Sequence, residues 1–122
     1  MQTLFVTGTD TNVGKTYVTC LLLKKLLATG LTVGAYKPVC SGAEKDAAGR
    51  YFWSDIDALK SATDQVFPEE LICPQKFLAA VAPNIAAELE GKSVSDDLLL
   101  SGVSAWMKLV DTLIVEGAGG IF

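Results

Sequence analysis

The feature that most constrains this chain is the stretch at residues 8–16, which reads Gly-Thr-Asp-Thr-Asn-Val-Gly-Lys-Thr. A short apolar run precedes it and a long apolar run of helical length follows it, so the stretch joins a strand to a helix. Glycine at positions 8 and 14 permits backbone angles that let successive N–H groups turn toward phosphate oxygens. The helix that starts near Gly14 adds a positive end worth about +0.5 charge. This context predicts a phosphate-binding loop.

The last loop residues predict how a nucleotide is held. Lys15 would bridge the terminal phosphates of ATP, and the Thr16 hydroxyl would hold Mg²⁺. Five residues separate the two glycines, whereas the common pattern has four, because Thr9 stands where the first glycine normally lies. A glycine-rich turn that binds nothing would explain the glycines, but it would not explain Gly14-Lys15-Thr16 at a helix start.

Composition limits the class of protein. With 122 residues the chain forms at most one domain, and half of its residues are apolar, as expected for a globular core. The net charge of −4 disfavours nonspecific binding to nucleic acid or to an anionic membrane. The absence of histidine excludes histidine-based catalysis within these residues. We therefore expect a single ATP-binding domain over residues 1–122, with no nucleic-acid or membrane partner.

Cysteine usage and the first residues bear on the compartment. Cys20, Cys40 and Cys73 are widely spaced and form no Cys-x-x-Cys pair, which indicates reduced thiols rather than a disulfide frame or a zinc site. No basic and apolar leader precedes the first predicted strand, and Lys24 and Lys25 interrupt the longest apolar stretch. We therefore expect a cytoplasmic protein.

Hydrophobic patterning predicts alternating strands and helices. We expect strands at residues 3–7, 32–36 and 111–116, a short edge strand at 71–73, and helices at 14–29, 55–63 and 83–90. A further helix begins at the Ser95 cap, and its apolar face runs to Val110. Gly30 is expected to end the first helix, Ser54 to cap the second, and residues 41–54 to form a polar connection. Such alternation predicts right-handed crossovers and a doubly wound, mostly parallel α/β sheet of the phosphate-loop hydrolase type.

Polar groups follow the predicted strands, at the sheet edge where such folds bind ligands. Lys37 closes the second strand as either a catalytic ammonium group or a solvated lysine. Ser41 is either a ligand-binding hydroxyl or an ordinary turn residue. Asp55 is either a helix-start acid or a Mg²⁺ ligand. Glu116 ends the last strand, where an acid matches the second nucleotide motif of phosphate-loop proteins, and the glycines behind it allow close approach to a ligand.

Several segments together resemble the dethiobiotin synthetase family. They are residues 8–16, Tyr36-Lys37-Pro38-Val39 with Ser41-Gly42, Ser54-Asp55, and Val115-Glu116-Gly117-Ala118-Gly119-Gly120. The five-residue gap between the loop glycines is this family's own version. The resemblance spans essentially the whole chain but about the first half of a typical family member. We therefore expect the amino-terminal part of a larger domain, with a sheet that is incomplete at its C-terminal end.

The resemblance implies an ATP- and Mg²⁺-dependent ligase step of biotin biosynthesis. 7,8-Diaminononanoate forms a carbamate with CO₂, ATP phosphorylates it, and the second amine closes a cyclic urea, giving dethiobiotin, ADP and phosphate. Lys15 and Lys37 would be catalytic, Thr11 and Ser41 would position the diamine, and a homodimer is implied. The metal ligands would be Thr16, Asp55 and Glu116. The nucleotide would be bound by Asn12, Val13, Gly14, Lys15, Thr16, Tyr17, Asp55, Glu116, Gly117, Ala118 and Gly119.

Other interpretations remain open from the sequence. A partition or regulatory ATPase switch of the same fold commonly carries an additional lysine near the start of the loop, where this chain has Asp10. A catalytically silent nucleotide-binding fragment would keep the loop without turnover. A related enzyme that amidates cobyrinic acids is a further alternative. The segment Lys37-Pro38-Val39 with Ser41-Gly42 favours the diamine enzyme over it.

Overall fold

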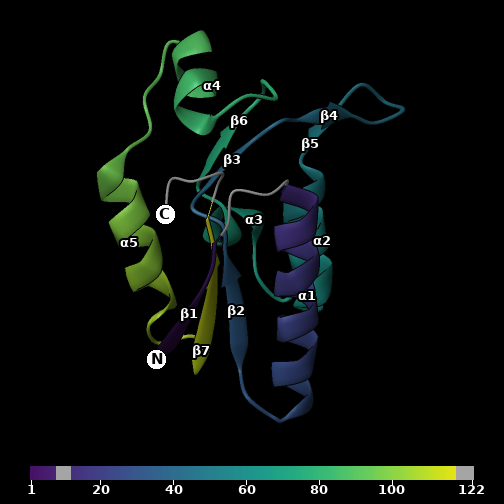
Figure 1. Cartoon of the computed structure of the whole chain (residues 1–122), viewed down its shortest axis with the longest axis vertical. Coiled ribbons are helices and arrows are strands. Elements are labelled where there is room, and N and C mark those ends of the chain that lie inside the picture. Colours follow the sequence, from purple (N-terminus) through teal and green to yellow (C-terminus); the bar gives the residue numbers. More distant parts are fainter. Residues whose placement is uncertain (8–11, 118–122) are drawn as a thin grey trace.

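A three-stranded parallel sheet forms the centre of the molecule (Figure 1). The computed structural model describes residues 1–7 and 12–117. Within them, β1 (Gln2–Val6), β7 (Thr112–Glu116) and β2 (Val33–Tyr36) lie in the order β1-β7-β2. Both outer strands run parallel to β7, with Leu4 and Ala35 each opposite Ile114. The predicted mostly parallel α/β sheet is confirmed.

The central strand β7 is buried on both faces. Leu113, Ile114 and Val115 are at most 2 % exposed, as expected for a parallel strand that is covered by helices. At the edge of this sheet, β1 leaves Phe5 64 % exposed. The continuous apolar run in the sequence therefore marks the strand that carries Glu116 to the sheet edge.

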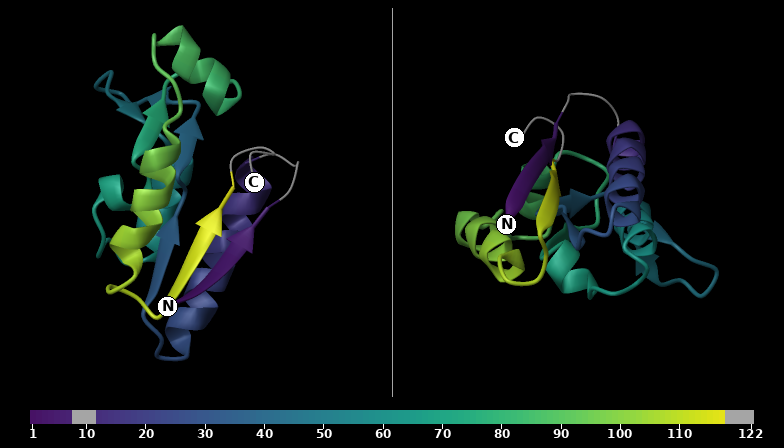
Figure 2. Two further views of the ribbon diagram at one scale, coloured as in Figure 1. Left: turned by 90° about the vertical axis from the view of Figure 1, so that its left-hand side faces the viewer. Right: turned by 90° about the horizontal axis from the view of Figure 1, so that it is seen from below.

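Helices cover the two faces of this sheet. Figures 1 and 2 show α1 (Asn12–Ala28) and α5 (Asp96–Trp106) on opposite sides of the strands. Two of the predicted helix ends are confirmed: Gly30 follows α1 with a φ of +88°, and the Ser95 hydroxyl accepts from the Leu98 amide at 3.2 Å. None of the helices in the described part of the chain has the length and apolar character needed to cross a bilayer.

Close packing fixes β2 against α5. A Cβ on Gly102 would lie 1.9 Å from the hydroxyl oxygen of Tyr36, and a Cβ on Gly34 would lie 2.3 Å from the Trp106 ring. The Tyr36 hydroxyl donates to the Leu99 carbonyl at 3.1 Å. Burial raises the pKa of Tyr36 to about 12. These contacts fix the carboxyl end of β2, where the next residue enters the candidate site.

A second parallel pair extends beyond the carboxyl end of β2. It consists of β3 (Val39–Ser41) and β6 (Gln75–Phe77), with Val39 opposite Gln75. An antiparallel hairpin of β4 (Glu44–Lys45) and β5 (Tyr51–Phe52) lies beside it in Figure 1. The predicted polar connection at residues 41–54 therefore contains short strands. The strands β4 and β5 have two residues each, so they are too short to show an alternating apolar pattern in the sequence.

The predicted edge strand at residues 71–73 is wrong. Those residues close the short helix α3 (Glu69–Ile72), and the Cys73 amide donates to the Glu69 carbonyl at 2.8 Å. Glu69 and Glu70 stabilise the start of this helix because acidic side chains interact favourably with its positive end. The strand of this region, β6, begins after Pro74 rather than ending before it.

The helices α2 (Ser54–Ala62) and α4 (Pro83–Leu89) lie close to their predicted positions. The predicted cap of α2 is wrong, because Ser54 is the first helical residue and Trp53 occupies the N-cap position without a side-chain cap bond. The Trp53 indole instead donates to the Phe77 carbonyl at 2.9 Å. This bond ties the start of α2 to the end of β6. In the last helix, Val110 lies beyond the end of α5 but is buried.

Candidate nucleotide and metal site

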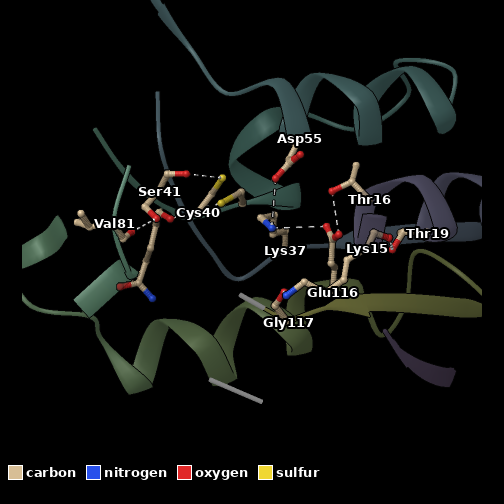
Figure 3. A network of polar contacts seen from close by, with 12 residues as sticks. Lys15, Thr16, Thr19, Lys37, Cys40, Ser41, Asp55, Val81, Glu116 and Gly117 are labelled. Carbon is tan, nitrogen blue, oxygen red and sulfur yellow. Dashed lines mark hydrogen bonds and ion pairs between the residues drawn. The ribbon is translucent and has the colours of Figure 1, made fainter. Parts of the chain in front are cut away.

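The first turn of α1 places two buried polar side chains beside the end of β7. Lys15 and Thr16 are each 5 % exposed. The Lys15 ammonium group donates to the Gly117 carbonyl at 3.1 Å, and the Thr16 hydroxyl donates to Glu116 Oε1 at 2.8 Å (Figure 3). The loop end and the strand-end acid, which are a hundred residues apart in the sequence, are therefore in direct contact.

Lys37 follows β2, and its ammonium group lies between two carboxylates (Figure 3). Its backbone N–H donates to the Ile72 carbonyl at 2.8 Å. Nζ lies 3.6 Å from Asp55 Oδ2 and 3.6 Å from Glu116 Oε2. The side chains of Lys37 and Glu116 are each 1 % exposed. This burial excludes the solvated lysine that the sequence left open.

Two buried atoms of this cluster lack a hydrogen bond. Within the described ranges, neither Lys37 Nζ nor Glu116 Oε2 has a hydrogen-bond partner. Their separation of 3.6 Å gives an ion pair but exceeds a normal hydrogen-bond distance. Because buried polar groups are nearly always hydrogen-bonded in folded proteins, these atoms indicate a place for a charged ligand.

The charge state of Glu116 depends on its neighbours. Burial raises the pKa of this carboxyl above its ordinary value of 4.5, while the Lys37 charge and the Thr16 hydrogen bond oppose the rise. Asp55 adds a second negative charge that also raises the Glu116 pKa. The site therefore favours positive charge beside Glu116.

The oxygen atoms of Thr16, Asp55 and Glu116 suit a hard cation such as Mg²⁺. The unsatisfied Glu116 Oε2 supports this fit. Across residues 1–7 and 12–117, no group of three or more histidine, cysteine or acidic side chains could hold a metal by itself. Mg²⁺ in nucleotide sites is commonly held by one or two carboxylates together with phosphate oxygens and waters. The donor set therefore fits a metal that arrives with a phosphate ligand.

An open pocket of about 310 Å³ adjoins this donor set between α1 and α2. Its lining comprises Thr16, Tyr17, Cys20, Ser54, Asp55 and Ala58. Two candidate metal ligands, Thr16 and Asp55, are therefore accessible to a ligand from this side. Tyr17, which the family resemblance implies as part of the nucleotide site, is 66 % exposed.

Ser41 lies apart from the cluster. It ends β3, and its hydroxyl donates to the Val81 carbonyl at 2.6 Å. In Figure 3, Ser41 and Val81 lie beyond Cys40, on the side away from Glu116. Ser41 is thus a strand-end residue rather than an ordinary turn residue, and its oxygen retains lone pairs that can accept a hydrogen bond.

The predicted site is only partly covered by the described residues. Thr11, Ala118 and Gly119 lie outside them, and so do the side chains of Asn12 and Val13, whose backbone begins α1 together with Gly14. The structure brings together Lys15, Thr16, Lys37, Asp55, Glu116 and Gly117.

The sequence did not predict that three cysteines lie near this site. A hydrogen bond between the thiols of Cys73 and Cys40 holds the pKa of Cys40 below its usual range, and it raises the pKa of Cys73 together with burial. Cys20 lines the pocket and donates to the Ala58 carbonyl at 3.7 Å. Of these three positions, only that of Cys20 could have been predicted from the sequence, because Cys20 lies four residues after Thr16 on the same helix face.

Comparison with known proteins identifies the family of the chain and several named relatives. The family described as AAA domain matches residues 2–122. The protein named ATP-dependent dethiobiotin synthetase BioD from Anaeromyxobacter sp. (strain Fw109-5) is 45 % identical over 99 % of this chain and 52 % of its own length. The protein of the same name from Caulobacter sp. (strain K31) is 45 % identical over 99 % of this chain and 52 % of its own length. The one from Rhodopirellula baltica is 42 % identical over 97 % of this chain and 46 % of its own length. The chain spans about half the length of the curated relatives it matches.

Proposed function

We propose that this chain, which belongs to the AAA domain family, is the ATP-binding half of an ATP-dependent dethiobiotin synthetase. The observation that carries the proposal is the buried cluster in which Lys37 lies between Asp55 and Glu116. Its unsatisfied ammonium group and carboxylate oxygen match a ligand that brings both an anion and a cation, as Mg²⁺-ATP does. The names of the relatives support the same reaction.

The N-terminal turn of α1 would hold the phosphates. Backbone N–H groups at this end of the helix favour anions, and the proposed set runs over residues 12–17. Lys15 would move from the Gly117 carbonyl to the terminal phosphates. The backbone of Gly117, Ala118 and Gly119 would line the nucleotide from the end of β7.

Thr16, Asp55 and Glu116 would hold Mg²⁺ beside those phosphates. When bound, the ion neutralises phosphate charge and polarises the phosphoryl group that is transferred. The Thr16 hydroxyl is already oriented by its hydrogen bond to Glu116. Asp55 is presented by the first turn of α2, which Trp53 anchors to the end of β6.

Lys37 would stabilise the charge that develops on the carbamate and the transferring phosphoryl group. One amine of 7,8-diaminononanoate adds to CO₂ and loses a proton, which gives a carbamate. A carbamate oxygen takes the γ-phosphoryl group and releases ADP. The second amine then attacks the carbamoyl carbon, phosphate leaves, and the cyclic urea closes. Phosphoryl transfer relies on positioning and on charge stabilisation rather than on a protein nucleophile. The buried Lys37 would supply the charge stabilisation.

Thr11 and Ser41 would position the diamine and its carbamate. The Ser41 hydroxyl donates to Val81, so it would accept a hydrogen bond from a substrate amine. The diamine would then lie on the β3 side of Lys37, and the nucleotide would lie on the α1 side.

We further propose that residues 1–122 are one ATP-binding unit within a larger homodimeric protein of the cytoplasm. The greater length of the relatives supports the larger protein. The cysteines of the described residues are free thiols, which is typical of a reducing compartment.

The deciding experiment measures ADP release by the full-length protein that carries this chain. With 7,8-diaminononanoate, bicarbonate and Mg²⁺ present, we expect ADP and dethiobiotin in equal amounts. Omission of the diamine should abolish ADP release. ATP turnover that ignores the diamine would overturn the proposal and would favour a regulatory ATPase.

A further inference from the structure

The connection between β6 and α4 lies against the chain around Ser41. Its Leu78 carbonyl accepts from the Ala43 amide at 2.9 Å, and its Val81 carbonyl accepts from the Ser41 hydroxyl at 2.6 Å. Between these contacts, a Cβ on Gly42 would lie 3.7 Å from the backbone of Ala80. The direction of the Ser41 hydroxyl is therefore set by the position of this connection.

Two side chains hold the peptide group at the start of the connection, because the Trp53 indole donates to its Phe77 carbonyl and the Glu90 carboxylate accepts from its Leu78 amide. The Leu78 amide, which follows the last residue of β6, donates to Glu90 Oε2 at 2.8 Å. A hydrogen bond to a carboxylate is about twice as strong as a neutral one. The other carboxylate oxygen of Glu90 lies 3.8 Å from the Lys92 ammonium group, whose side chain is 63 % exposed.

Glu90 is itself held on a fixed element. The Glu90 amide donates to the Ala87 carbonyl at 3.0 Å, and Gly91 follows with a φ of +71°, which closes the C-terminal turn of α4. α4 packs on β3 and β6 through an apolar cluster of Val39, Phe77, Ala86 and Ala87. The backbone that carries the Glu90 carboxylate is therefore fixed by packing, and the hydrogen bond from the Leu78 amide fixes the Leu78 backbone relative to α4.

We propose that Glu90 is a positioning residue for the diamine side of the site. Its carboxylate fixes Leu78, the connection carries that constraint to the Val81 carbonyl, and the carbonyl orients the Ser41 hydroxyl. The inference rests on the proposed function, in which Ser41 positions the diamine. The hydrogen bond and the ion pair of Glu90 go to Leu78 and Lys92, and neither residue belongs to the first turn of α1 or to the cluster around Lys37. We therefore expect the nucleotide side to be independent of Glu90.

Kinetics of the full-length protein that carries this chain test the proposal. Glu90→Ala should raise the KM for 7,8-diaminononanoate about tenfold, as expected for the loss of one charged hydrogen bond. The KM for ATP should stay unchanged. Glu90→Gln keeps an oxygen acceptor for Leu78 and should restore most of the diamine KM. Lys92→Ala is the matched control, because it removes the exposed ion pair and leaves the Leu78 bond intact.

Two kinetic outcomes would overturn the inference. If Glu90→Ala raised both KM values equally, Glu90 would support the whole fold rather than the diamine side. If Glu90→Gln were as impaired as Glu90→Ala, the hydrogen bond to Leu78 would not be the property that matters.

Amide hydrogen exchange separates this inference from the proposed function, because it needs no substrate. The Leu78 amide should exchange slowly in the wild type, in Glu90→Gln and in Lys92→Ala, and quickly in Glu90→Ala. Unchanged exchange in Glu90→Ala would sink the inference even if the enzyme makes dethiobiotin. A wild type without diamine-dependent turnover would instead sink the proposed function, while exchange would still decide whether Glu90 holds Leu78.

Discussion

The substitution Lys37→Met keeps the length of the side chain but removes the positive charge between Asp55 and Glu116. At an effective dielectric constant of about 20, opposite charges 3.6 Å apart attract by about 4.6 kcal/mol. The desolvation of the buried ammonium group offsets much of that attraction. Removing one partner of a buried ion pair generally costs about 3–5 kcal/mol, because the remaining charge is left uncompensated. We expect the free energy of unfolding near neutral pH to fall by that amount.

The loss of unfolding free energy in Lys37→Met should depend on pH, and the direction of that dependence identifies Glu116 as the acid left without its partner. Burial already raises the pKa of Glu116 above 4.5 and the Lys37 charge opposes it, so Lys37→Met raises this pKa further. A carboxyl with a higher pKa in the folded state stabilises the fold below its unfolded pKa, and that stabilisation is lost as pH rises through the folded pKa. The deficit of the variant should therefore be small near pH 4.5 and should grow toward neutral pH.

Urea unfolding at about pH 5 and about pH 8 measures this difference. Lys76→Met is the matched control, because Lys76 and Glu69 form an ion pair whose side chains are 23 % and 28 % exposed. A partly exposed pair contributes about 1 kcal/mol or less, so the control should lose little at either pH. An equally large deficit of Lys37→Met at both pH values would refute the claim that Glu116 is the uncompensated group.

Further substitutions test the roles of individual residues. Lys37→Met should also slow product formation by about 10²–10³-fold, as for the loss of one transition-state donor, while equilibrium titration still detects ATP binding. Thr16→Val removes the hydroxyl that donates to Glu116, so nucleotide binding should lose its Mg²⁺ dependence in the same titration. Gly34→Ala would place a Cβ 2.3 Å from the Trp106 ring, and urea unfolding should show a loss of about 1–3 kcal/mol.

For each of these three substitutions, one result would contradict the role given to the residue. Undiminished product formation by Lys37→Met would remove Lys37 from the catalytic set. An unaltered Mg²⁺ requirement in Thr16→Val would remove Thr16 from the donor set. Wild-type stability of Gly34→Ala would contradict the close approach of α5 to β2.

The phosphate-loop end and the strand-end acid could be predicted because their signals are local. Lys15 and Thr16 follow a glycine at the start of a strongly apolar helix, and Glu116 follows a continuous apolar run. Parallel pairing of β1 with β7 then brings both segments to one sheet edge, where the Thr16–Glu116 hydrogen bond forms. Local pattern and sheet topology together were sufficient for this half of the site.

The contact between Lys37 and Asp55 could not be predicted from local pattern. It depends on the path of the intervening chain, which the sequence presented as a polar connection and which folds as β3 and a hairpin. The error at residues 71–73 has a related cause, because a short apolar run does not distinguish a strand from a helix turn. The role proposed for Glu90 depends on a hydrogen bond to Leu78, twelve residues away, and no sequence pattern indicates it.

The charges of the cluster bear on the proposed binding of Mg²⁺. Two lysines, Lys15 and Lys37, stand against two acids, Asp55 and Glu116, so the formal charges of the four side chains sum to zero. The Thr16 hydroxyl donates a hydrogen bond to Glu116, and its oxygen keeps lone pairs for a metal. A lone cation would still lie close to Lys37, which is 3.6 Å from Glu116 Oε2. Calorimetric titration should therefore detect tight Mg²⁺ binding only when ATP is present, because the triphosphate offsets the added positive charge. Tight binding of Mg²⁺ without nucleotide would contradict this reading of the cluster.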